Sequence, residues 1–150
     1  MRHKTRQRSR GATTVEFAIC LPIVLFLIFA TMVGGLGVFR YQQTAELARE
    51  AARWACVHGG QYAEETGNPA ATPQDVYQNA ILPAAATMNL SKLSYQVTWN
   101  KSNMPLDANG SVQVPQGNTV SVTVTYQWIP EVYLAGPFSL SSTSTAQMIY

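Results

Sequence analysis

Charged residues are scarce in this chain of 150 residues, because Asp, Glu, Lys and Arg together make up only 12 % of it. That is about half of their usual share in soluble domains. Five of the ten basic residues precede Gly11, so the remainder carries five basic against eight acidic side chains. The body of the chain is therefore mildly acidic, and this distribution excludes nucleic acid as a partner of the whole chain.

Residues that perform chemistry are equally few. The two histidines, His3 and His58, lie far apart in the sequence and offer no pair for a metal ion or a proton relay. There is no Cys-x-x-Cys, no glycine-rich phosphate loop and no G-x-S-x-G. The adjacent Glu64 and Glu65 are typical of solvated charge, and Asp107 begins a turn rather than a calcium loop, since the distal glutamate is missing. We expect no enzyme activity, no cofactor and no metal site.

The two cysteines cannot pair within the chain. Cys20 and Cys56 lie about 36 residues apart on what we predict to be one helix, which separates them by about 54 Å. A disulfide needs Cα atoms within about 7 Å of each other. Cys56 is then either a buried small hydrophobic residue or half of an intermolecular bridge in an oxidising compartment.

One long apolar run dominates the N-terminal third. Residues 17–39 contain no Asp, Glu, Lys, Arg or His, and as a helix they would span roughly 34 Å, enough for a hydrocarbon core of about 30 Å. The basic leader precedes the run, so the positive-inside rule places the N-terminus in the cytoplasm and the C-terminus outside. The alternative is a cleaved signal peptide. Its apolar region would be about 7–15 residues long and would precede an A-x-A site, which is absent here, although residues 31–35 offer a weak small-residue site.

The apolar helix should continue beyond the membrane. Polar residues 40–58 keep a helical period, with Glu and Arg on one side and small residues on the other, and no Gly or Pro intervenes between Gly37 and Gly59. We predict a rod of about 45 residues, roughly 65 Å long, that Pro22 bends and that Gly59 and Gly60 terminate. The predicted domains are a cytoplasmic leader at 1–11, a long helix at 12–58 with its transmembrane part at about 17–39, and an extracytoplasmic α+β domain at 59–150.

Small residues line this helix in two places. Either the extension packs on the chain's own C-terminal domain or it packs on helices of other subunits, and both contacts are compatible on different faces. In the membrane part, Ala30 and Gly34 form a small-xxx-small pair beside Gly35 and Gly37. The stripe of the extension consists of Tyr41, Ala45, Ala48, Ala52 and Ala55.

The C-terminal part predicts a small α+β domain. Residues 61–71 are rich in loop-forming residues, and Thr72 followed by Pro73 and Asp75 predicts a capped helix that begins at Pro73 and is kinked or ended by Pro83. A second short helix is expected over 84–89. Alternation with period two then predicts strands at 93–99 and 120–128, and a weaker one within 140–149.

These strands should form an antiparallel sheet of three or four strands. Turn signals occur at 107–111 and 114–118. One face of the sheet is apolar and must be covered by another layer, for which the Pro73 helix and the C-terminal half of the long helix are the candidates. The fold class is therefore α+β, with a long N-terminal helix on a small sheet and one short helix.

The N-terminal stretch "SRGATTVEFAICLP" resembles the prepilin class of proteins. In that class a basic leader ends in Gly, a prepilin peptidase cuts after it, and the fifth residue of the mature chain is Glu. Gly11 matches the leader glycine, Ala12 the new N-terminus and Glu16 the fifth residue. With "AELAREAARWA" further along, the chain resembles the TadE-like family, the pseudopilins or minor pilins of the tight adherence (Flp) pilus.

The resemblance implies a non-enzymatic, single-pass protein of the inner membrane that takes part in assembly of an adhesive pilus. Its implied partners are a prepilin peptidase, other pilin or pseudopilin subunits, the inner-membrane assembly platform and the lipid bilayer, but no nucleic acid. Cleavage would create an ammonium group at Ala12, which stands one helical turn from Glu16 and could pair with it or with its counterpart on a neighbouring subunit.

A second hypothesis belongs to a different class of function. The chain would be a permanently anchored binding module that no prepilin peptidase processes, and its sheet domain would recognise a ligand or partner outside the membrane. The two hypotheses differ at Gly11, because only the pseudopilin requires a small residue there.

Overall fold

The computed structural model describes residues 9–101, 103, 118–130 and 136–149. The chain divides into two compact units, Met1–Gly37 and Val38–Tyr150, which are described separately. Apart from Asn118, the two predicted turns at 107–111 and 114–118 lie outside the described residues.

One helix, α1, supplies all the described structure of the first unit. It spans Ser9–Val57 without interruption and passes through Pro22, while Thr31 bonds back to the carbonyl of Leu27 at 2.8 Å. A proline removes one helical hydrogen bond but leaves the assignment intact here. The bend at Pro22 stays a prediction.

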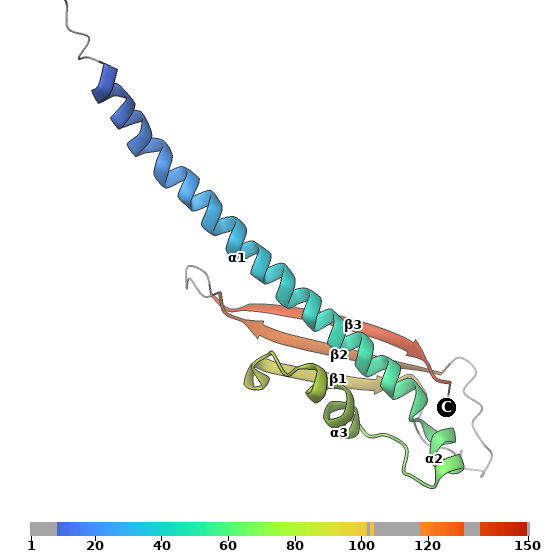
Figure 1. Ribbon diagram of the computed structural model, residues 1–150. Helices are drawn as coiled ribbons and strands as arrows, with labels where there is room; N and C mark the ends of the chain where they lie inside the picture. Colours follow the sequence, from blue (N-terminus) through green and yellow to red (C-terminus); the bar gives the residue numbers. More distant parts are fainter. Residues whose placement is uncertain (1–8, 102, 104–117, 131–135, 150) are drawn as a thin grey trace, which may run out of the picture. The chain divides into compact units, whose positions relative to one another are not determined.

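The second unit contains a three-stranded antiparallel sheet in the order β1-β2-β3 (Figure 1). Its strands are β1 at Leu93–Trp99, β2 at Thr119–Trp128 and β3 at Phe138–Gln147. Val97 of β1 lies opposite Val122 of β2, and Val124 lies opposite Ser142 of β3. The predicted strands are confirmed, each within two residues of its expected start.

The two faces of the sheet differ in composition. On β2, Val120, Val122 and Val124 are fully buried, as strict alternation demands. The opposite face carries no charge on any of the three strands, and neighbouring hydroxyls pair across it, for example Thr123 with Thr143 at 2.8 Å. Its side chains are Ser94, Gln96, Thr98, Thr119, Ser121, Thr123, Thr125, Gln127, Ser139, Ser141, Thr143, Thr145 and Gln147.

The apolar face is covered by helices, as the sequence predicts. The part of α1 after Val38 lies over the sheet (Figure 1) and buries a continuous stripe. The second cover lies beside β1, where the ring of Tyr77 stacks on that of Tyr95 with centroids 4.7 Å apart and the Tyr95 hydroxyl donates to Gln74 at 3.0 Å. The α+β class is therefore confirmed. The stripe on α1 consists of Thr44, Leu47, Ala48, Ala51, Ala52, Ala55 and Cys56.

The predicted loop at 61–71 is wrong in its first half, where α2 forms at Gly60–Thr66. Gly60, which was predicted to terminate the long helix, is the first residue of α2. Gln61 reaches Glu65 at 3.2 Å, one turn further on, and Gly67 closes the helix with φ +72°, a conformation that glycine adopts without strain. Ala and Glu are good helix formers, so the segment followed its local propensity.

The Pro73 helix is confirmed, and its helical run ends at Ala84, one residue after Pro83. Helix α3 spans Pro73–Val76, with Thr72 and Asp75 in a reciprocal capping box. A π-helical turn, η1, follows at Tyr77–Ile81, and α4 at Leu82–Ala84 contains Pro83. The amide of Leu82 bonds to the carbonyl of Tyr77, five residues back. Pro83 has no N–H to donate, and such a π-bulge is one way in which a helix adjusts its hydrogen bonds next to a proline.

The second short helix expected over 84–89 does not form. Residue 84 closes α4, and residues 85–88 make turns instead. The amide of Ala85 still bonds to the carbonyl of Ile81 and that of Met88 to Ala85, both at 2.9 Å. A single 3₁₀ turn, η2 at Leu90–Lys92, then leads into β1 and is capped by the Asn89 side chain.

Candidate processing and assembly segment

The predicted processing site lies at the start of α1. Gly11, Ala12 and Glu16 all belong to the helix, so Ala12 and Glu16 are one turn apart on one face, with a rise of about 6 Å between them. Gly11 and Glu16 are exposed. A Cβ added at Gly11 would meet no described atom within 4 Å. Nothing in the described part of the chain therefore requires a glycine at this position.

The helix that follows exposes its apolar side chains all round. Phe17, Phe26 and Phe29 are 65 %, 67 % and 54 % exposed, and every described side chain from 13 to 32 is exposed. A soluble protein rarely leaves such a large continuous apolar surface uncovered. The segment is long and apolar enough to cross a membrane, and lipid or other helices are the environments that suit such a surface.

The small residues of the membrane part also face outwards. Ala30, Gly34 and Gly35 are exposed, and Gly37 is half-buried. A Cβ at Gly34 or Gly35 would meet nothing within 4 Å. Glycine inside a helix costs roughly 1 kcal/mol relative to alanine. No contact with the described residues accounts for Gly34 and Gly35, and small residues of this kind are typical of contacts between membrane helices.

The alanine stripe of the extension has a different environment. Ala48, Ala52 and Ala55 are at most 1 % exposed, whereas Ala45 is half-buried and Tyr41 is exposed. The three buried alanines thus pack within the chain's own second unit, which is one of the two contacts that the sequence left open. Of the four alanines, only Ala45 keeps accessible surface for another subunit.

The two cysteines are both free, Cys20 exposed and Cys56 buried. The Cys56 thiol donates to the carbonyl of Arg53 at 3.1 Å. Burial raises the pKa of this thiol, and a hydrogen bond with the backbone of Cys56 itself and the Arg53 charge oppose that effect only in part. The burial agrees with the small-hydrophobe interpretation of Cys56. Among the described residues, no group of three or more His, Cys, Asp or Glu could hold a metal ion.

One group of residues escaped the sequence analysis. Trp54, His58 and Tyr62 follow one another at intervals of four and form a row of rings where α1 ends and α2 begins. In the sequence His58 stands out only as a lone histidine. The i, i+4, i+8 spacing of aromatic residues was the signal that could have identified the row, but the predicted helix end at Gly59 concealed it.

Comparisons with known proteins agree with the placement of these segments. The family model described as TadE-like protein matches residues 11–53, which begin at Gly11 and end within the alanine-rich part of α1. No curated protein and no solved structure matches the chain. The sequence resemblance to the TadE-like family is thereby confirmed over residues 11–53.

Proposed function

We propose that this protein is a non-enzymatic, single-pass pseudopilin of a tight adherence (Flp-type) pilus, and that it takes part in pilus assembly for surface adhesion. The observation that carries the proposal is the TadE-like match over 11–53, which coincides with a helix long and apolar enough to cross a membrane. In this role the first unit anchors the chain in the inner membrane. The leader at 1–11 lies in the cytoplasm, and the α+β unit lies on the opposite side.

Processing by a prepilin peptidase after Gly11 gives this segment its chemistry. Removal of the leader takes away five basic residues that hold the N-terminus at the cytoplasmic surface. It also creates an ammonium group on Ala12, one helical turn from the Glu16 carboxylate. An unpaired charge in the membrane is costly, so pairing within one subunit or between neighbours fixes the register of the helices.

The exposed glycines supply the second element of assembly. Gly34 and Gly35 present backbone without side chains on a helix whose own chain does not approach them. Another pilin or pseudopilin helix can approach closely there, and van der Waals packing then replaces lipid contacts. The assembly platform of the inner membrane is the natural site for this exchange.

Mass spectrometry of the membrane-extracted protein tests the proposal directly. In cells with an active prepilin peptidase we expect a mature chain that begins at Ala12, and in cells without the enzyme a chain that keeps the leader. Gly11→Val should keep the leader in both, because the larger side chain blocks the peptidase and not the fold, whereas the matched control Gly35→Val should be processed normally. A wild-type chain that retains residues 1–11 beside an active peptidase would favour the permanently anchored binding module.

A further inference from the structure

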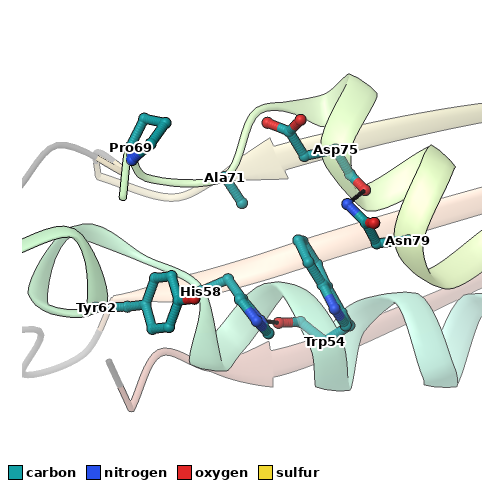
Figure 2. A pocket seen from close by; sticks show the side chains of 7 residues that line it. All are labelled: Trp54, His58, Tyr62, Pro69, Ala71, Asp75 and Asn79. Atoms are coloured by element: carbon teal, nitrogen blue, oxygen red, sulfur yellow. Dashed lines mark hydrogen bonds between the residues drawn. The ribbon is translucent and has the colours of Figure 1, made fainter. Parts of the chain in front are cut away.

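A hollow of about 500 Å³ lies within the second unit, outside the segment that carries the proposed function. On one side it is lined by Trp54 at the end of α1, by His58 and by Tyr62 of α2. The chain that leads into α3 and η1 forms the other side, with the side chains shown in Figure 2. Its volume falls within the range of small-molecule sites, about 300–1,000 Å³.

The aromatic side of the hollow is fixed by its own contacts. The ring of His58 stacks on that of Trp54 with centroids 3.9 Å apart and planes 10° apart, and Tyr62 lies against the other side of His58 at 4.7 Å. His58 Nδ1 lies 2.8 Å from the carbonyl oxygen of Trp54. A carbonyl only accepts, so Nδ1 carries the hydrogen, and in that tautomer Nε2 is an acceptor. The row is therefore a preformed apolar wall with a hydrogen-bond acceptor in it.

The opposite wall is held to the end of α1. The amide of Ala71 donates to the carbonyl of His58 at 2.9 Å, so the two walls are tied together at one end. Asn79 donates through Nδ2 to the carbonyl of Asp75 at 3.0 Å, and its side chain lines the hollow together with Trp54 (Figure 2). No bond from Asn79 Oδ1 to the described part of the chain is present, so this oxygen is available to a ligand.

The charges around the hollow decide which ligand suits it. No Lys or Arg is among the described residues that line it, which disfavours phosphates and carboxylates. Its one acidic side chain, Asp75, turns its carboxylate away from the rings (Figure 2) and accepts from the Thr72 amide at 2.9 Å and from the Thr72 hydroxyl at 2.6 Å. Asn79 contributes a neutral amide to this wall, so among the described lining residues a cation finds no free carboxylate beside the rings.

We propose that this hollow binds a neutral polyhydroxylated ligand, namely the pyranose ring of a saccharide. The apolar C–H face of a pyranose suits the aromatic row, and its hydroxyls can donate to Asn79 Oδ1 and His58 Nε2. The wall of rings and the few fixed polar groups are the combination that small-molecule sites use for orientation. The inference is independent of leader cleavage and of the pilus, because every residue that carries it belongs to the second unit.

Saturation-transfer NMR on the full chain tests this site. The protein is placed in phosphatidylglycerol nanodiscs, which contain neither sugar nor choline, and is probed with methyl β-D-glucopyranoside, methyl α-D-mannopyranoside and N-acetylglucosamine at up to about 10 mM. We expect saturation of the ring C–H protons of at least one pyranose, with an affinity on the order of 1 mM. Asn79→Ala should weaken that binding about fivefold, and Tyr62→Ala should weaken it further.

The variants are chosen so that folding does not confuse the result. Asn79 is exposed and α2 contains no buried residue, so neither substitution removes core packing. Gln96→Ala, on the hydroxyl-rich face of the sheet, is the matched control and should bind as the wild type does. The proposal is overturned if none of the three pyranoses is saturated, if choline chloride alone is saturated, or if Asn79→Ala and Tyr62→Ala bind as well as Gln96→Ala.

Discussion

The backbone amide of Ile149 donates to the carbonyl oxygen of Cys56 at 3.0 Å. Cys56 lies in the last turn of α1, where carbonyls have no partner inside their own helix. Ile149 lies just beyond the end of β3, 93 positions further along the sequence. The end of the chain that follows the sheet therefore caps the end of the long helix.

Hydrogen exchange should detect the hydrogen bond between Ile149 and Cys56. The side chain of Ile149 is 62 % exposed, yet we expect its amide to exchange at least about tenfold more slowly than that of Asn68, because exchange requires the contact with α1 to open. The amide of Asn68 bonds only to the nearby, exposed Thr66 hydroxyl at 3.3 Å. Residue-resolved exchange by NMR makes the comparison, and equal rates would show that the end of the chain does not stay docked.

Loss of the cap at Thr72 should lower stability in a way that depends on pH. Two hydrogen bonds from Thr72, the hydroxyl first and the backbone amide second, lower the pKa of Asp75. Thr72→Ala removes the hydroxyl and should cost about 1 kcal/mol of unfolding free energy at pH 6, measured from urea titrations followed by tryptophan fluorescence.

The sign of the pH effect follows from the lowered pKa of Asp75. The ionised Asp75 carboxylate stabilises the folded state fully above its unfolded pKa of about 3.9. This stabilisation is lost as the pH falls through the lower pKa of the folded state. The difference between wild type and Thr72→Ala should therefore shrink at pH 3. Gln78→Ala, an exposed site on the same helical segment, should stay within about 0.5 kcal/mol at both pH values. A Thr72→Ala cost as large at pH 3 as at pH 6 would rule out the carboxylate's part.

Cys56 should resist alkylation while the second unit is folded. Its thiol is 7 % exposed, and burial raises its pKa, so both access and thiolate formation are reduced. In a Cys20→Ser background, maleimide labelling at pH 7.5 should be at least about 100-fold slower than after urea denaturation. A cysteine introduced at exposed Ser141, in a background without the two native cysteines, is the control. Disulfide-linked dimers on a non-reducing gel would contradict this burial.

Gly34→Leu should weaken association of the membrane helices without touching the second unit. A Cβ at Gly34 would meet no described atom within 4 Å, so the urea midpoint of the second unit should not change. The leucine side chain keeps a second helix from approaching closely, so we expect about a tenfold drop in association within bilayers. Energy transfer between labelled subunits and the amount recovered in sheared pili measure this association. Met32→Leu, also exposed, is the matched control. Unchanged association of Gly34→Leu would remove the glycines from the proposed interface.

The long helix, the strands and the capped helix could be predicted because each depends on neighbours in the sequence. The uncharged run before Arg40 needs no tertiary contact to favour a membrane. The alternation of Val120, Val122 and Val124 with polar residues places the three valines on the same face of the sheet, whichever segments cover that face. Thr72 and Asp75 satisfy each other three residues apart. Local periodicity and local hydrogen bonds were sufficient for all of these.

Other features depended on residues that are distant in sequence. The alanine stripe had two possible partners, and only the fold showed that Ala48, Ala52 and Ala55 are buried within their own unit. The hollow beside Trp54 exists because Ala71 bonds to His58 and returns the chain over the aromatic row. A sequence states which residues share a helix face, but it does not state what covers that face.

The sequence by itself thus determined the apolar helix, the strand faces and the placement of Glu16 one helical turn after Ala12. The tertiary structure decided that Ile149 caps the end of α1 and that the buried alanines are used within the chain. The physical reason is range: propensity, capping and periodicity act over about four residues. Burial and the pairing of helix-end carbonyls are settled only when distant segments meet.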